Sequence, residues 1–332
     1  MDLETVDCPI CEKDDTVELM RVRDLNLLQP GEFRLVRCRG CGLSYVNPRP
    51  TWEAMGRYYT ADYWVATGRC ADESKLGAGV QEALRWLGQH RPGGRVLDVG
   101  CGAGNQAATM MRRGFEVVGL DPHEQACQVA RELNGVNVVC ANLETADLPD
   151  NSFDAVMFSA VLEHVHEPLV DLRRVRALLR PGGVVVVRAP NTQCWQARLF
   201  GRWWFLEVPR HLYHLTPRTL DSLLRKAGFV NVTCRAVPSW RFGSAIFQTS
   251  VLHTLRAGHL ARRGVEVTPS PGETVGQALD GLVYDEVPSV VKRAFRWFVG
   301  HVLYLPLAAE NVFGRSADLL GIASKPEDTV GA

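Results

Sequence analysis

Four cysteines near the start of the chain have the residue type and spacing of metal ligands. Cys8-Pro-Ile-Cys11 and Cys38-Arg-Gly-Cys41 are two C-x-x-C pairs. Two thiolates at this spacing can grip one Zn²⁺ from a tight turn, and two such turns complete a tetrahedral site. Because four protein ligands leave no open position, we predict a structural zinc ion. The strand-like segments V-E-L-M-R-V-R and F-R-L-V-R-C between the pairs predict a zinc ribbon.

A glycine-rich turn in the middle of the chain has the composition of a ligand-binding loop. The stretch R-V-L-D-V-G-C-G-A-G-N (residues 95–105) begins as a buried strand and breaks into Gly100, Gly102 and Gly104. A dinucleotide fingerprint, G-x-G-x-x-G, would place its third glycine where Asn105 stands. The turn could also serve only to let a strand and a helix pack closely. The loop by itself therefore does not identify its ligand.

Two carboxylates narrow the choice of ligand. Asp98 stands just before the turn, where it would repel a pyrophosphate but attract a cation. Asp121 ends the next predicted strand, F-E-V-V-G-L-D, and a carboxylate at that position can accept both ribose hydroxyls of an adenosine. A cationic adenosyl ligand without phosphates satisfies both carboxylates and the loop. S-adenosylmethionine (SAM) is such a ligand.

The elements that carry these residues alternate between helix and strand. From residue 80 onward, amphipathic helical patterns and short apolar strand patterns follow one another, with glycine or proline at their ends. This alternation predicts an α/β fold with a doubly wound, Rossmann-like sheet. Ligands of such sheets bind at the carboxyl ends of the strands near the switch point, which is where we expect the turn at 100–104.

Six motifs in this region resemble the class I SAM-dependent methyltransferases in order and spacing. They are V-L-D-V-G-C-G-A-G, G-L-D, L-P-D-N-S-F-D-A-V, L-E-H-V, L-L-R-P-G-G and A-G-F, and S-A-D-L-L-G-I-A-S-K-P resembles the last strand of that seven-stranded fold. The resemblance implies cofactor contacts from Asp98, Gly100, Gly102, Gly104, Asp121, Asn142, Leu143 and Ser159. Within that class, the ribbon and P-R-H-L-Y-H-L-T-P are similar to bacterial enzymes acting on small metabolites, sugars and quinone-like compounds.

Titratable residues after two later strands are candidates for a catalytic base. His164, beside Glu163, is the first candidate because imidazole titrates near neutrality, so we expect the rate to rise through an ionisation near pH 6–7. Alternatively, either residue only caps or orients the following helix. His211 and His214, three residues apart, are further candidates for the base or for a weak metal site.

The pattern divides the chain into four segments. We predict a zinc-ribbon module over residues 1–60, a SAM-binding core over 61–238, a helical insertion or lid over 239–315, and the last core strand and tail over 316–332. Phe295, Phe298, Val299, Val302 and Leu303 have the spacing of an amphipathic helix. Basic residues at its start would let 292–305 contact anionic lipid at the periphery of a membrane. A lid or a homodimer helix is the alternative.

Composition limits the classes of function. With 46% hydrophobic and 22% charged residues, zero net charge and an acidic ribbon, the chain lacks the basic surface that nucleic acid requires. It starts without an apolar signal region, and its ten cysteines are expected to be thiols or metal ligands, so we expect a cytoplasmic protein. We predict a methyltransferase acting from SAM on a hydroxyl of a small-molecule acceptor of sugar or natural-product type. The alternatives are an rRNA or tRNA methyltransferase, a membrane-associated quinone O-methyltransferase, and a non-catalytic SAM-binding protein.

Overall fold

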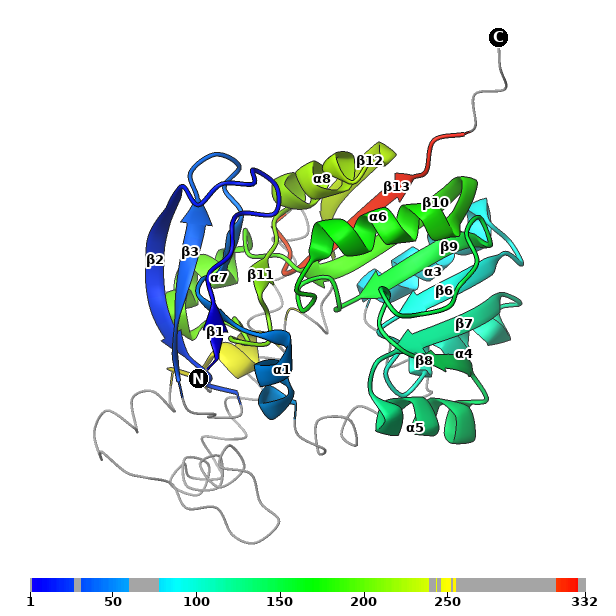
Figure 1. The fold of residues 1–332 in the computed structure, drawn as a ribbon, viewed down its shortest axis with the longest axis horizontal. Helices are drawn as coiled ribbons and strands as arrows, with labels where there is room; N and C mark the ends of the chain where they lie inside the picture. Colours follow the sequence, from blue (N-terminus) through cyan, green and yellow to red (C-terminus); the bar gives the residue numbers. More distant parts are fainter. Residues whose placement is uncertain are drawn as a thin grey trace, which may run out of the picture.

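A seven-stranded mixed sheet forms the centre of the computed structural model, which describes residues 2–26, 31–59, 78–238, 243, 246–251, 253–254 and 315–327 (Figure 1). The strand order is β12-β13-β10-β9-β6-β7-β8. The strands are β6 (Arg95–Val99), β7 (Glu116–Asp121), β8 (Asn137–Cys140), β9 (Phe153–Ser159), β10 (Leu179–Pro190), β12 (Val230–Val237) and β13 (Asp318–Ser324). Strands β6 to β10 run parallel, and β13 is antiparallel to both of its neighbours. The predicted doubly wound α/β fold is therefore confirmed.

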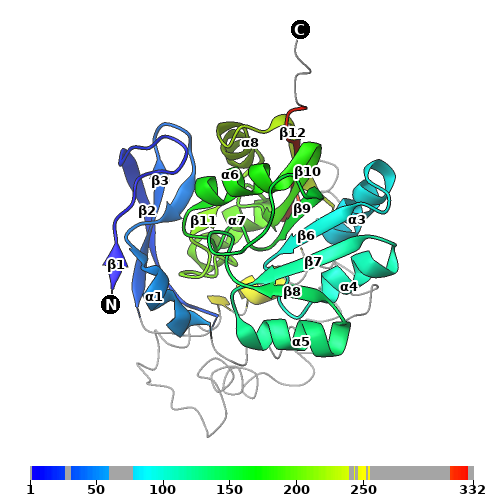
Figure 2. The same cartoon turned by 45° about the vertical axis from the view of Figure 1, so that its right-hand side comes forward.

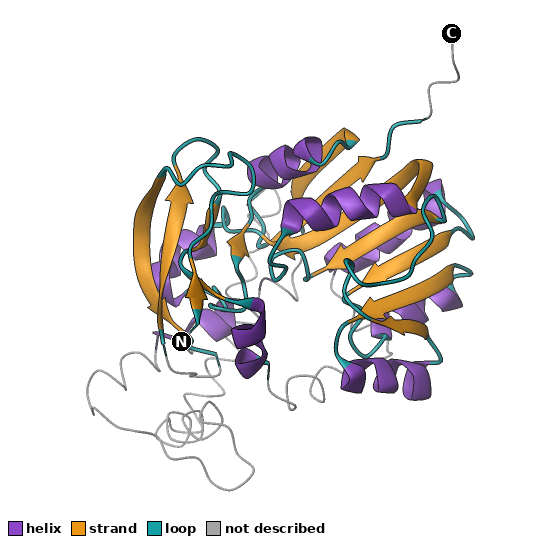
Figure 3. Ribbon diagram, in the orientation of Figure 1, coloured by secondary structure: helices purple, strands orange, loops and turns teal. Residues whose placement is uncertain are grey.

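Helices cover both faces of this sheet because its parallel strands are apolar on both sides (Figure 3). In β9, Val156 and Phe158 belong to one core cluster, whereas Ala155 and Met157 belong to the other. The first cluster contains α6 (Pro168–Leu178) and α8 (Pro217–Lys226). The second contains α3 (Ala78–His90), α4 (Asn105–Arg112) and α5 (Glu124–Asn134). Alternation with period two along each strand thus produces three layers.

The N-terminal module, residues 2–26 and 31–59, lies beside the core and forms a second sheet with it (Figure 2). The order of this four-stranded sheet is β11-β4-β3-β2. Its strands are β2 (Thr16–Arg23), β3 (Glu32–Cys38), β4 (Ser44–Val46) and β11 (Tyr213–His214), while β1 (Leu3–Glu4) pairs with β5 (Arg49–Pro50). The module ends in α1 (Trp52–Met55) and the 3₁₀ turn η1 (Gly56–Tyr58). Because β11 comes from the core, the ribbon sheet crosses the predicted boundary at residue 60.

Two further elements, α7 (Trp195–Phe200) and the 3₁₀ turn η3 (Gly201–Trp203), lie between β10 and β11 in the chain. The described residues within 243–254 are also helical. The amphipathic helix predicted over 292–305 lies outside the described residues, as does most of the insertion predicted over 239–315. Among the residues that the structure describes, no helix is both long and apolar enough to cross a lipid bilayer.

Candidate active site

The glycine loop lies at the switch point of the sheet, because β6 has β7 on one side and β9 on the other. Gly100, Gly102 and Gly104 all have positive φ, at 65°, 53° and 78°. A Cβ on Gly100 would lie 2.5 Å from Val161 Cγ2, and one on Gly104 would lie 2.9 Å from Val136 Cγ2. A Cβ on Gly102 would meet no atom within 4 Å. Gly100 and Gly104 thus serve packing, whereas Gly102 faces a space that a ligand can use.

Asp121 is buried at the end of β7 and fastens the glycine loop. Its Oδ2 accepts a hydrogen bond from Gly102 N at 2.9 Å, and its Oδ1 accepts one from His123 N at 2.9 Å. The ring nitrogen His123 Nδ1 lies 3.1 Å from the same Oδ1. Because a carboxylate offers about four lone-pair sites, it keeps capacity for ribose hydroxyls. Asp121 therefore fits the predicted role and also shapes the loop.

Asp98 is 2% exposed on β6, and only one of its oxygens has a hydrogen-bond partner among the described residues. Its Oδ1 accepts from Gln106 Nε2 at 3.1 Å, whereas Oδ2 is buried with no hydrogen bond among the described residues. Burial raises the pKa of Asp98 to about 7, which the Gln106 hydrogen bond opposes and the nearby Asp121 adds to. A buried oxygen in this state favours a cationic or hydrogen-bond-donating ligand. With the space at Gly102, it fits SAM.

The remaining predicted cofactor residues lie at the same edge of the sheet. Asn142 and Leu143 follow β8 after one residue, Ala141, whose N–H donates to the carbonyl of Asp121 at 3.1 Å. The side-chain oxygen of Asn142 accepts from Thr145 N and Oγ1 at 2.8 Å, so it holds a turn. Leu143 is buried in the core, and Ser159 ends β9. Their contacts with a cofactor stay predictions.

The four predicted base candidates come together in one polar cluster, defined as Glu163, His164, His211 and His214. One ligand atom each from Glu163, His164 and His211 lies within 4.8 Å of the others. The rings of His164 and His211 are 4.6 Å apart, and those of His211 and His214 are 6.5 Å apart. Both carboxyl oxygens of Glu163 and Nε2 of His214 are buried without a hydrogen bond among the described residues. His214 does not belong to the group that could hold a metal ion, which is formed by the other three.

Burial removes charge from this cluster. It raises the pKa of Glu163 to about 8, which the nearby N–H of its own backbone and the charge of Arg188 oppose. Burial, followed by the neighbouring His211, lowers the pKa of His164 to about 3, and burial lowers that of His214 to about 4. The pKa of His211 is also well below its usual value, because of burial and the nearby His214 and Arg210. Because desolvation disfavours the imidazolium, the buried position argues against the expected ionisation of His164 near pH 6–7.

Residues that sequence reasoning did not assign hold these imidazoles in place. Arg210 is fully buried and pairs with Glu207 Oε1 at 3.2 Å and with Asp24 Oδ2 at 3.1 Å. The other oxygen of Glu207 lies 3.3 Å from His211 Nε2. His164 Nδ1 lies 3.1 Å from the Arg210 carbonyl oxygen. Adjacency to His211 was the available signal for Arg210, but no local pattern points to Asp24.

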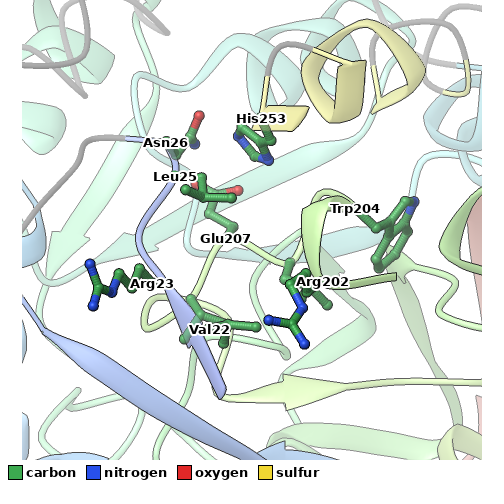
Figure 4. Close-up of a pocket in the computed structure, with 10 residues that line it drawn as sticks. Val22, Arg23, Leu25, Asn26, Arg202, Trp204, Glu207 and His253 are labelled. Carbon is green, nitrogen blue, oxygen red and sulfur yellow. The ribbon is translucent and has the colours of Figure 1, made fainter. Parts of the chain in front are cut away.

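A narrow pocket is lined by residues of both the N-terminal module and the core (Figure 4). It lies between residues 22–26 of the module and residues 202–208 of the core, and His253 also lines it. Glu207 is one of its lining residues and contacts His211 as well. Asp24–Arg210 and this pocket thus lie along the same junction between module and core.

The four predicted zinc ligands also come together. One sulfur each from Cys8, Cys11, Cys38 and Cys41 lies within 4.8 Å of the others, and the sulfurs of Cys8 and Cys41 are 3.5 Å apart. Burial raises the pKa of Cys8, Cys11 and Cys41 to about 11, and at Cys11 and Cys41 the neighbouring thiols raise it further. At Cys38, burial is outweighed by backbone N–H donors from Cys41 and Gly40, and the pKa falls to about 7. The cluster could hold one Zn²⁺ through four thiolates.

Comparisons with known proteins agree with this geometry. The family described as "Methyltransferase domain" matches residues 72–234. A ubiquinone biosynthesis O-methyltransferase of Cereibacter sphaeroides is 35% identical over 146 residues, which cover 40% of this chain and 59% of that protein. One of Acinetobacter baylyi is 31% identical over 163 residues, covering 44% and 68%. The match thus spans less than two thirds of the first of these relatives.

A solved structure shares the fold over most of the chain. Phosphoethanolamine N-methyltransferase 2 of Haemonchus contortus, in complex with SAM, superposes with a TM-score of 0.51 and 17% sequence identity. The superposition covers 94% of this chain and 69% of that one. At this identity the likeness concerns the fold alone.

Proposed function

The chain belongs to the class I SAM-dependent methyltransferases, and we propose that it transfers a methyl group from SAM to a hydroxyl of a small phenol- or quinol-type acceptor. The observation that carries the proposal is that one edge of the sheet holds both the cofactor-type loop and the uncharged polar cluster. The curated relatives are named for ubiquinone biosynthesis, which favours the quinone alternative over the sugar-type acceptor that the sequence alone suggested.

Three groups of this chain would hold the cofactor. Gly102 leaves room for it, and Asp121 offers lone pairs to its ribose. Asp98 Oδ2, which no described residue hydrogen-bonds, faces the positive end of the cofactor. When bound, SAM supplies a methyl carbon that bonds to the acceptor oxygen as the carbon–sulfur bond breaks and its electron pair stays on sulfur. The chain's part is to align the acceptor oxygen with that carbon, and alignment of this kind can contribute effective molarities of roughly 10⁵–10⁸ M.

His164 would take the proton of the acceptor hydroxyl. Its Nδ1 faces the Arg210 carbonyl oxygen, which can only accept, so Nδ1 carries the ring proton and Nε2 keeps a lone pair. Since the pKa of His164 is lowered to about 3, its ring is neutral at physiological pH but is a weak base. A weak base can deprotonate an acidic hydroxyl more readily than a less acidic one. A phenol, with a pKa of about 10 as in tyrosine, meets this requirement better than a sugar alcohol.

The uncharged cluster also selects among acceptors. With a protonated Glu163 and neutral histidines, the four side chains of the cluster carry no charge at neutral pH, and the neighbouring Arg210 is already paired with Glu207 and Asp24. Leaving a charged acceptor group unpaired in such surroundings would be costly. A neutral aromatic hydroxyl is therefore the acceptor class that the cluster favours.

The proposal is tested by incubating the purified protein with SAM and either 4-methylcatechol or methyl glucoside, and identifying methylated products by mass spectrometry. We expect methylation of the catechol and none of the glycoside. His164→Ala should lower kcat by about 10²-fold or more with little change in the affinity for SAM, because the base acts only as charge develops on oxygen. His90→Ala, at the exposed end of α3, is the matched control and should keep the parent rate.

Two outcomes would contradict the proposal. The acceptor class is wrong if only the glycoside is methylated. The assignment of the base is wrong if His164→Ala and His90→Ala are equally active.

A further inference from the structure

Tyr59 comes from the N-terminal module but lies against the polar cluster of the core. It directly follows η1, and its backbone N–H donates to the Gly56 carbonyl, which holds it at the end of that turn. Its hydroxyl oxygen lies 3.0 Å from His164 Nδ1. A residue that precedes His164 by more than a hundred positions thus contacts the proposed base directly.

The same nitrogen of His164 has a second neighbour, the Arg210 carbonyl oxygen at 3.1 Å. Because that carbonyl can only accept, the proton resides on Nδ1, and the Tyr59 oxygen is a second acceptor for the same N–H. Two acceptors on separate segments restrict rotation of the imidazole more than one does. They leave Nε2 as the nitrogen with a lone pair, and no described residue forms a hydrogen bond with it.

The two segments that supply these acceptors are joined to each other. Tyr58 is 1% exposed and packs edge-on against Phe33 of β3, with ring centroids 5.9 Å apart. Its carbonyl oxygen accepts from Arg210 Nη1 at 3.4 Å, and the same nitrogen pairs with Asp24 of the module. Tyr59 and the Arg210 carbonyl therefore keep their relative positions through a buried ion pair.

The ring of Tyr59 also reaches the cofactor side of the site. Its centroid lies 5.7 Å from that of His123 and 6.3 Å from that of His164, both within the usual range for aromatic pairs. His123 in turn contacts the carboxylate of Asp121. Tyr59 thus links the carboxylate proposed to bind ribose with the imidazole proposed to accept the proton.

We propose that Tyr59 is a positioning residue of the active site, through which the N-terminal module holds His164 with Nδ1 bonded and Nε2 available to the acceptor. This role rests on the proposed function, in which His164 is the base. The zinc-ribbon module is then part of the catalytic site and not an appendage to it.

The test compares Tyr59→Phe with Tyr45→Phe. Tyr59→Phe keeps the aromatic ring and removes the Tyr59 hydroxyl that contacts His164. The second removes a buried hydroxyl of the same module that has no hydrogen-bond partner among the described residues. With SAM and 4-methylcatechol, Tyr59→Phe should lower kcat by roughly 2- to 10-fold, the usual worth of one hydrogen bond, while KM for SAM stays unchanged. Tyr45→Phe should keep the parent kcat.

A spectroscopic measurement tests the contact without any acceptor. In protein labelled with ¹⁵N-histidine, the parent should show His164, assigned through His164→Asn, as the tautomer protonated on Nδ1. Tyr59→Phe should shift or broaden these signals toward exchange with the other tautomer, and Tyr45→Phe should leave them in place.

The outcomes separate the two proposals. Unchanged His164 signals in Tyr59→Phe, a parent protonated on Nε2, or equal losses of kcat in both variants would overturn the role of Tyr59. If the parent methylates no hydroxyl acceptor, the proposed function fails, and the tautomer measurement alone decides whether Tyr59 positions the ring.

Discussion

Substituting Gly102 by alanine should separate cofactor binding from folding. The residue has φ of 53°, and a Cβ there would meet no atom within 4 Å. An alanine in the left-handed region costs roughly 1–2 kcal/mol in the free energy of unfolding, with no added clash. Because the new methyl group would enter the space proposed for SAM, we also expect the affinity for SAM to fall at least ~10-fold, which is about 1.4 kcal/mol.

Gly135 and Gly100 supply the controls for this substitution. Gly135 ends α5 with φ of 62°, and its Cβ would also meet no atom within 4 Å, so Gly135→Ala carries the same backbone cost away from the loop. Gly100→Ala would place its Cβ 2.5 Å from Val161, and it should cost more stability than either, about 3 kcal/mol or more.

Urea unfolding and calorimetric titration with SAM measure the two effects separately. We expect Gly102→Ala and Gly135→Ala to have similar stabilities, and only the first to bind SAM weakly. Equal affinity of these two variants for SAM would refute the placement of the cofactor at Gly102. A Gly100→Ala protein as stable as Gly135→Ala would refute the packing argument.

Three further predictions concern the polar cluster and the zinc site. Because the pKa of Glu163 is raised to about 8, the parent should lose stability as pH rises from about 4.5 to about 8, whereas Glu163→Gln should not. Urea unfolding should show the free energy of unfolding of the variant rising relative to that of the parent over this range, by on the order of 5 kcal/mol. A difference that does not change with pH would contradict the shift. The kcat for a catechol should not change through pH 6–7 and should rise near pH 8, because Glu163 then ionises and stabilises the imidazolium that forms on His164. A single rise of kcat at pH 6–7 would instead indicate a histidine base whose pKa is not lowered. Purified protein should contain one Zn²⁺ per chain, and Cys38→Ser should lose it while it still binds SAM. The kcat of this variant should fall several-fold, because β4 of the N-terminal module pairs with β11, the strand that carries His214. Cys234→Ser, outside the cluster, should keep both metal and activity, and a zinc-free parent would refute the site.

The sequence alone was sufficient for the fold and the cofactor-type loop, because these depend on neighbouring residues. An apolar run such as V-V-V-V in β10 predicts a strand buried on both faces, and it is one. The turn at Gly100, Gly102 and Gly104 needs positive φ at each position, which glycine adopts without strain. The spacing of Cys8, Cys11, Cys38 and Cys41 predicts their cluster, since each pair shares one tight turn.

Only the tertiary structure decided how the active site is assembled and charged. The polar cluster joins the loop after β9 to β11 and the residues just before it. Tyr59, which contacts His164, and Asp24, which pairs with the adjacent Arg210, come from the N-terminal module. No local pattern records such contacts, because they arise from packing between surfaces far apart in the chain. The pKa values of Glu163 and His164 likewise depend on desolvation by these surfaces. Residue types and spacing therefore indicate which chemistry is available, whereas burial decides which protonation state performs it.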